Sequence, residues 1–133
     1  FPVLESLFLS ENKNLFGYVF NTISEICTLL GIKTELIISS ELNMDHGLKA
    51  EQKVLEINRI LNSDTYINPI GGTELYDKEN FKNIGVDLLF IKSKPIRYDQ
   101  SGNEFIECLS IIDVLMFNDL NKVKSLLNEY ELV

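Results

Sequence analysis

The chain has 133 residues, 45% of them hydrophobic, which suits one domain with a buried core and is short for two. Its 20 acidic and 12 basic residues give a formal net charge of −8. This balance argues against general binding to nucleic acids or anionic membranes, because such binding requires clustered lysines and arginines. We predict a single domain over residues 1–133, with no nucleic-acid partner and no membrane partner.

The closest group of basic residues is Lys92, Lys94 and Arg97. We interpret these three side chains as the solvated end of a strand, with contact to one anionic ligand as the alternative.

Cysteine and histidine usage fits a reducing compartment. Cys27 and Cys108 lie in apolar surroundings without a Cys-x-x-Cys spacing, and we interpret both as buried structural thiols. His46 has no second histidine or cysteine nearby in the sequence, so no metal site is predicted. No apolar run reaches the roughly 20 residues that cross a bilayer, and no signal-peptide pattern opens the chain. We therefore expect a cytoplasmic protein, and the sequence does not name a cofactor.

The first half of the chain alternates helical and strand patterns. Residues 1–10 are apolar, and Pro2 fits a helix start or the entry of the chain. Apolar residues at spacings of three and four predict a helix over residues 14–30, which Gly31 ends. The β-favouring run Thr34–Ile38 predicts a strand, and a second helix is predicted over Lys49–Leu61.

Two serines, Ser39 and Ser40, follow the first predicted strand. Ligands gather at the carboxyl ends of strands in open parallel sheets, so both serines are predicted to contribute to a binding site. The alternative is that one of them caps the next turn.

The main functional signal lies in Asp64–Tyr76. Its β-favouring run predicts a strand that finishes near Asn68, because Pro69 cannot donate to a sheet. Gly71 and Gly72 then predict a loop in which the backbone can approach a ligand closely. A helix after this loop would offer free N–H groups to an anion.

That helix is predicted to begin near Thr73 and to cover residues 74–83, with Leu75 and Phe81 in the core. The nearly continuous apolar run Val86–Ile91 predicts a strand covered on both faces. Three strands reached through helices predict an α/β fold with a small, mostly parallel sheet.

The last third of the chain predicts a loop and two helices. Pro95 and Gly102 indicate a loop over residues 93–103. A helix over Leu109–Phe117 begins with Ser110 and Asp113, which have the spacing of a capping box, so Asp113 is interpreted as a cap partner. A final helix over residues 119–129 is predicted to be capped by Asn118.

Two segments, Thr65–Asp77 and Leu109–Phe117, together resemble the WbqC-like protein family. The same pattern is matched by Leu30–Thr34, Ser39–Leu42, Phe81, the strand Gly85–Phe90, the pair Tyr98 and Gln100, and Phe105. Nothing matches the Gln-Pro-Tyr-type motif that members carry near their start, and the chain begins with Phe1 instead of methionine. We therefore expect the carboxy-terminal portion of a longer protein, with the absent amino-terminal portion as a partner.

The resemblance implies a group transferase that acts on activated or nucleotide-linked sugars, since members are found with genes for surface polysaccharide and O-antigen assembly. On this hypothesis Glu74 is a general base and a sugar is the small-molecule partner. The substrate-binding residues are then predicted to be Asn68, Gly71, Gly72, Tyr76, Tyr98 and Gln100, together with Ser39 and Ser40. A phosphate beside Glu74 would be repelled unless a metal or a basic residue intervened, which a neutral sugar or acyl substrate avoids.

Two other hypotheses stay open. The chain could be a module that binds a sugar or nucleotide without catalysis, because no nucleophile and base pair is visible in the sequence. It could also be the structural half of a longer enzyme, in which the glycines, Ser110 and Asp113 close turns and cap helices.

Overall fold

The structure is a computed structural model that describes residues 2–102 and 104–133, so predictions that fall on Phe1 and Asn103 lie outside it. The described chain divides into two compact units, each built from segments distant in sequence. Unit 1 contains the residues up to Leu36 and Pro95–Glu129, and unit 2 contains Ile37–Lys94 and Tyr130–Val133. The prediction of a single domain is not tested by this division.

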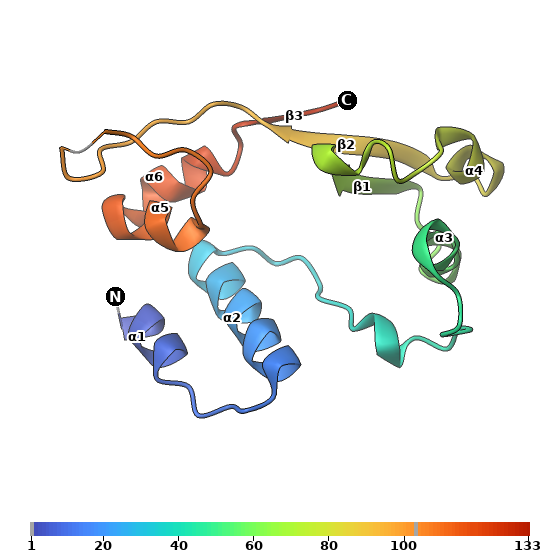
Figure 1. Ribbon diagram of the computed structural model, residues 1–133, viewed down its shortest axis with the longest axis horizontal. Helices are drawn as coiled ribbons and strands as arrows, with labels where there is room; N and C mark the ends of the chain where they lie inside the picture. Colours follow the sequence, from blue (N-terminus) through green and yellow to red (C-terminus); the bar gives the residue numbers. More distant parts are fainter. Residues whose placement is uncertain (1, 103) are drawn as a thin grey trace. The chain divides into compact units, whose positions relative to one another are not determined.

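Unit 1 is helical and contains α1 (Pro2–Phe8), α2 (Leu15–Leu30), α5 (Ile111–Phe117) and α6 (Leu120–Leu126) (Figure 1). Helix α2 begins after Asn14, whose side chain accepts a hydrogen bond from the Gly17 N–H, and ends at Gly31, where a φ of 74° gives a left-handed cap. These ends match the prediction for residues 14–30. The core of unit 1 consists of Leu7, Ile26, Leu30, Val114, Leu115 and Val123.

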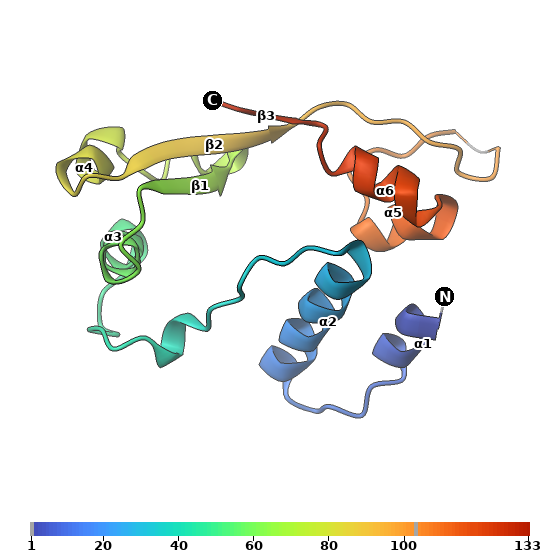
Figure 2. The same cartoon turned by 180° about the vertical axis from the view of Figure 1, so that it is seen from behind.

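Unit 2 contains a three-stranded sheet and the segments that carry the candidate site (Figure 2). Its helical elements are η1 (Ser39–Glu41), α3 (Ala50–Ile60), the 3₁₀ helix η2 (Ile70–Gly72) and α4 (Lys78–Asn83). Its strands are β1 (Thr65–Pro69), β2 (Asp87–Ser93) and β3 (Tyr130–Leu132), in the order β1-β2-β3. Strands β1 and β2 are parallel, and β2 and β3 are antiparallel.

One face of this sheet carries the core of unit 2. Leu88 and Phe90 of β2 are buried with Phe81 of α4 and with Val86. Tyr66 lies opposite Leu88 in the parallel pair, and so contributes to the same face. Helix α3 packs on this core through Val54 and Leu55, and Tyr76 and Ile84 complete it.

The α/β class and the three strands are confirmed, but the sheet is mixed and one strand was misplaced. The predicted strand Thr34–Ile38 is irregular, and Thr34, Glu35, Leu36 and Ile37 are exposed. A β-favouring sequence forms a strand only where neighbours complete its ladder, and no strand of the described chain pairs with this segment. The third strand is instead β3, which the sequence analysis assigned to no strand.

The helix predicted from Thr73 begins five residues later. Asp77 is the N-cap of α4, because its carboxylate accepts a hydrogen bond from the Glu79 N–H at 2.9 Å. Residues 73–77 link η2 to α4 through a turn instead, and Leu75 is 68% exposed, so its predicted core position is wrong. The predicted core position of Phe81 is confirmed.

Two further expectations are corrected near the carboxyl end. Asp119, and not Asn118, caps α6, because its side chain accepts from the Asn121 and Lys122 N–H groups. Cys108 is exposed, so its predicted burial is wrong. Within the described ranges, no helix is long and apolar enough to cross a membrane.

Candidate functional site

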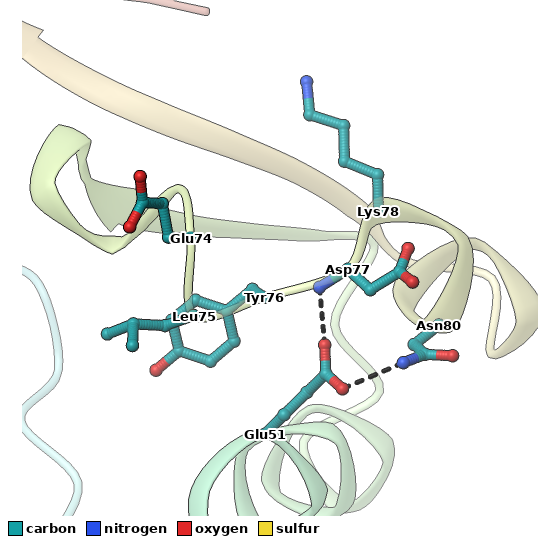
Figure 3. Close-up of a pocket in the computed structure, with 7 residues that line it drawn as sticks. All are labelled: Glu51, Glu74, Leu75, Tyr76, Asp77, Lys78 and Asn80. Atoms are coloured by element: carbon teal, nitrogen blue, oxygen red, sulfur yellow. Dashed lines mark hydrogen bonds between the residues drawn. The ribbon is translucent and has the colours of Figure 1, made fainter.

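The candidate site is a pocket at the turn that joins η2 to α4 in unit 2 (Figure 3). Its volume is about 570 Å³. The residues that line it are Glu51, Glu74, Leu75, Tyr76, Asp77, Lys78 and Asn80. The turn supplies four of them directly, α3 supplies Glu51, and α4 supplies Lys78 and Asn80.

The amino-terminal end of the turn is held by close packing around Gly72. Gly72 is buried, and a Cβ atom there would overlap the Asn68 side-chain oxygen and lie 3.5 Å from a ring carbon of Tyr76. Asn68 in turn donates its side-chain N–H to the Tyr66 hydroxyl at 2.7 Å. Only glycine fits between these side chains without moving them. Gly71, by contrast, is exposed and has open space where a Cβ would lie.

Aromatic packing then fixes Tyr76. Its ring meets those of Tyr66 and Phe81 edge to face, with centroids 5.7 and 5.9 Å apart. Tyr66 stacks on Phe81 at 5.3 Å, so the three rings form one cluster. Burial and the neighbouring Tyr76 hydroxyl raise the pKa of Tyr66 above its usual value of 10.0.

The carboxyl-terminal end of the turn is held by Glu51 of α3. One carboxylate oxygen of Glu51 accepts the Asp77 backbone N–H at 2.6 Å, and the other accepts a side-chain N–H of Asn80 at 2.8 Å (Figure 3). Hydrogen bonds to a charged carboxylate are stronger than those between neutral groups. The turn is thus fixed at both ends, while Glu74 between them is exposed.

The pocket is acidic. Glu51, Glu74 and Asp77 contribute three carboxylates, and Lys78 contributes the one positive charge among the lining residues. In the described chain, Glu74 has no hydrogen-bond or ion-pair partner. Carboxylates accept hydrogen bonds from hydroxyl and amino groups and repel phosphate. The described residues contain no cluster of three or more histidine, cysteine or acidic side chains suited to a metal ion.

The structure brings two of the predicted site residues, Glu74 and Tyr76, into this pocket. Asn68 and Gly72 support the turn from beneath and do not line the pocket. The other predicted residues of unit 2, Gly71, Ser39 and Ser40, are exposed and also lie outside its lining. The two serines form η1 and follow no strand, which removes the positional argument for them.

Tyr98 and Gln100 belong to unit 1, where they form a hydrogen-bonded cluster with Asp113. The Tyr98 hydroxyl donates to one Asp113 carboxylate oxygen at 2.6 Å, and the Gln100 amide donates to the same oxygen at 3.0 Å. Gln100 is buried, and its amide also exchanges two hydrogen bonds with the backbone of Ile106. Participation of Tyr98 and Gln100 in the same site as Glu74 stays a prediction.

This cluster changes the interpretation of Asp113. The Ser110 side chain accepts from the Ile112 N–H and caps α5 as predicted, but the Asp113 carboxylate accepts from Tyr98 and Gln100. Burial and the Asp113 carboxylate raise the pKa of the Tyr98 hydroxyl above 10.0. The role of Asp113 is therefore to hold the loop that precedes α5.

Four pocket residues were not predicted from the sequence: Glu51, Asp77, Lys78 and Asn80. A signal for Asp77 was present, because it ends the segment that carries the family resemblance and is a favoured N-cap residue. Glu51 gave no signal, since it lies 26 residues before its partner Asp77 on an otherwise ordinary helix.

Together these features define an α/β protein with an acidic, polar pocket on a turn that is fixed at both ends. The chain belongs to the WbqC-like protein family, whose sequence profile matches residues 1–125. Comparisons with curated proteins and with solved structures gave no match.

Proposed function

We propose that this WbqC-like protein is a group transferase of surface polysaccharide or O-antigen biosynthesis, and that the pocket beside Glu74 binds the acceptor sugar. The observation that carries this proposal is the carboxylate of Glu74, which has no partner among the described residues and lines a pocket of about 570 Å³. Small-molecule sites commonly enclose about 300–1,000 Å³, so a monosaccharide fits the available space.

The chemistry of the lining favours a polyhydroxyl ligand. Carboxylates accept hydrogen bonds from sugar hydroxyls, and the Asn80 amide and the Lys78 ammonium can donate to sugar oxygens. The half-buried ring of Tyr76 offers an apolar surface beside them. A donor with two phosphates suits this lining poorly, because three carboxylates face one lysine. The acceptor is therefore assigned to the pocket and the phosphates of an activated sugar donor to its outside.

In the proposed reaction, Glu74 accepts the proton of one acceptor hydroxyl or amino group. The oxygen or nitrogen of that group forms a bond to the electrophilic carbon of the activated donor. The bond between this carbon and the donor's leaving group breaks, and the leaving group departs with the electron pair. Glu74 is exposed and its side chain makes no hydrogen bond or ion pair with the described part of the chain, so replacing it removes the base without removing a support of the fold.

The test is a transfer assay on the intact protein, with UDP-linked sugars as donors and neutral and amino monosaccharides as acceptors, read by mass spectrometry. Glu74→Gln is expected to lower product formation at least a hundredfold while the melting temperature stays that of the wild type, since general-base catalysis contributes about 10²–10⁴-fold. The matched control is Glu41→Gln, another exposed glutamate of unit 2 that lies outside the pocket lining. Turnover that is unchanged in Glu74→Gln would remove Glu74 as the base.

The second candidate is a non-catalytic module that binds a saccharide while residues outside this chain carry the chemistry. The acidic lining favours this alternative, because it disfavours the phosphates that a nucleotide-linked donor brings. Calorimetric titration separates the two candidates. Binding of free monosaccharides with no transfer product from any donor would support the module, and turnover would support the transferase.

A further inference from the structure

Glu51 is the residue that connects helix α3 to the turn that carries the site. It lies in the first turn of α3, is half-buried, and uses one lone pair of each carboxylate oxygen on a group from the other side of the pocket. Both groups, the Asp77 N–H and the Asn80 amide, lie at the start of α4. Glu51 thus binds the segment at the point where the turn becomes a helix.

We propose that Glu51 is a positioning residue of the site, which holds Glu74 and Tyr76 in their binding geometry through Asp77. This inference rests on the proposed function, because it assigns Glu51 a role in binding at that same pocket. It separates Glu51 from Glu74, which lines the pocket and has no hydrogen-bond or ion-pair partner among the described residues.

Backbone hydrogen bonds inside the turn hold its first residues. The Thr73 and Leu75 N–H groups donate to Ile70 and Gly72 carbonyls, at 3.4 and 2.9 Å. The Asp77 amide, two positions after Leu75, donates to the Glu51 carboxylate and has no backbone acceptor among the described residues. Among the described residues, Glu51 is therefore the hydrogen-bond acceptor that joins the Asp77 amide to α3.

Asp77 connects Glu51 to α4 through its own hydrogen bonds. Its carboxylate accepts the Glu79 N–H, and its carbonyl accepts the Asn80 and Phe81 N–H groups at 3.1 and 3.4 Å. Phe81 is fully buried, so this end of α4 cannot move far. The bond from Glu51 to Asp77 therefore joins two rigid elements and leaves Glu74 and Leu75 as the displayed part of the turn.

The test compares Glu51→Ala with Glu51→Gln in the intact protein. Alanine removes both hydrogen bonds. Glutamine keeps them without the charge, because its amide oxygen can accept the Asp77 N–H and its amide N–H can donate to the side-chain oxygen of Asn80, whose exposed amide can turn over. The matched control is Glu56→Ala on the same helix, which removes only the surface ion pair with Arg59.

Two quantities are measured for each variant. Hydrogen exchange of the Asp77 amide measures the stability of its hydrogen bond to Glu51 and needs no ligand. Calorimetric titration with glucose, galactose and N-acetylglucosamine reports binding. Glu51→Ala is expected to accelerate exchange across residues 73–78 and to weaken monosaccharide binding about tenfold or more, since bonds to a charged group are among the stronger ones. Glu51→Gln keeps both hydrogen bonds in a neutral, weaker form, so its exchange and its binding should both lie closer to the wild-type values than those of Glu51→Ala.

Each other result overturns a definite part. Unchanged exchange in Glu51→Ala would show that the hydrogen bond from Asp77 to Glu51 does not stabilise the turn. Faster exchange with unchanged binding overturns the positioning role, while the proposed function stands. A Glu51→Gln variant that keeps exchange protection but binds as weakly as Glu51→Ala shows that Glu51 acts on the ligand through its charge, which also overturns the positioning role. A wild-type protein that binds no monosaccharide overturns the acceptor pocket itself, and the inference with it.

Discussion

The two adjacent glycines of the η2 segment make a prediction that depends on atomic packing alone. Gly71 has open space where a Cβ would lie, whereas a Cβ at Gly72 would overlap the Asn68 side-chain oxygen and lie 3.1 Å from the Asn68 Cγ. Neither glycine has a positive φ, so alanine can adopt the backbone conformation at both positions. Gly72→Ala should therefore destabilise the protein, and Gly71→Ala should not.

The expected magnitude follows from what Asn68 must do. To admit the new methyl group, its side chain must move away from the Tyr66 hydroxyl, which loses a hydrogen bond of about 1 kcal/mol. Overpacking of a well-filled site adds about 1–3 kcal/mol. The reduced entropy of the unfolded chain returns about 0.4–1 kcal/mol. The free energy of unfolding of Gly72→Ala should fall by about 1–3 kcal/mol, and that of Gly71→Ala should stay level or rise by up to about 1 kcal/mol.

The assay is urea unfolding of wild type and both variants, followed by circular dichroism. A third comparison repeats Gly72→Ala in an Asn68→Ala background, where the overlapping oxygen is absent. There the cost of the second substitution should nearly vanish, because the remaining neighbour, a ring carbon of Tyr76, lies at an ordinary contact distance of 3.5 Å. The reasoning is refuted if Gly72→Ala is as stable as Gly71→Ala, or if Asn68→Ala leaves the cost of Gly72→Ala unchanged.

Two further predictions concern unit 1. Tyr98→Phe should lower the free energy of unfolding at pH 7 by about 1 kcal/mol, because it removes the hydrogen bond to Asp113. Burial and the Asp113 carboxylate raise the pKa of Tyr98 above 10.0, so this contribution is complete below pH 10 and is lost as pH rises through the higher folded value. Urea unfolding from pH 8 to 11 should show the stability gap between wild type and Tyr98→Phe closing at the alkaline end, and a gap that widens there would contradict the sign. Asp119→Ala should cost about 1 kcal/mol through loss of the α6 cap and should cost more than Asn118→Ala, a comparison that thermal unfolding of both variants checks.

Local sequence signals were sufficient to predict elements whose hydrogen bonds and caps all lie within one segment. Helix α2 was predictable because its apolar period, the Asn14 cap and the Gly31 cap all lie within one segment. The strands β1 and β2 were predictable for a similar reason, since their β-favouring runs are bounded by turn residues.

Predictions from the sequence were wrong where residues distant in the chain decide the secondary structure or the hydrogen-bond partner. Thr34–Ile38 has the residues of a strand, but no strand of the described chain pairs with it. Tyr130–Leu132 has no strong pattern and pairs with β2. Asp113 has the spacing of a cap partner, but its carboxylate accepts hydrogen bonds from Tyr98 and Gln100, which lie 15 and 13 residues earlier in a loop. Propensity describes what a segment prefers alone, and packing decides between the preferences that remain.

The residues of the candidate site show the same difference between local signals and packing. Glu74 and Tyr76 were found because glycines and a helix signal drew attention to their turn, although the helix begins later than predicted. Asn68 and Gly72 were assigned to the ligand, and in the structure they pack against each other. The side chain of Asn68 occupies the space that a side chain at position 72 would need, and a sequence does not reveal this packing.

The two fixed ends explain how an exposed turn can carry a binding site. Ordering a free segment costs about 1–2 kcal/mol per residue, and a ligand that had to order residues 73–77 would lose much of its affinity. Here the aromatic cluster around Tyr76 and the hydrogen bond from Glu51 meet that cost during folding. Glu74 is then displayed by a turn whose conformation is set before any ligand arrives. The supports and the displayed carboxylate can therefore be varied separately, which is why Glu51 and Gly72 report on the turn while Glu74 reports on the chemistry.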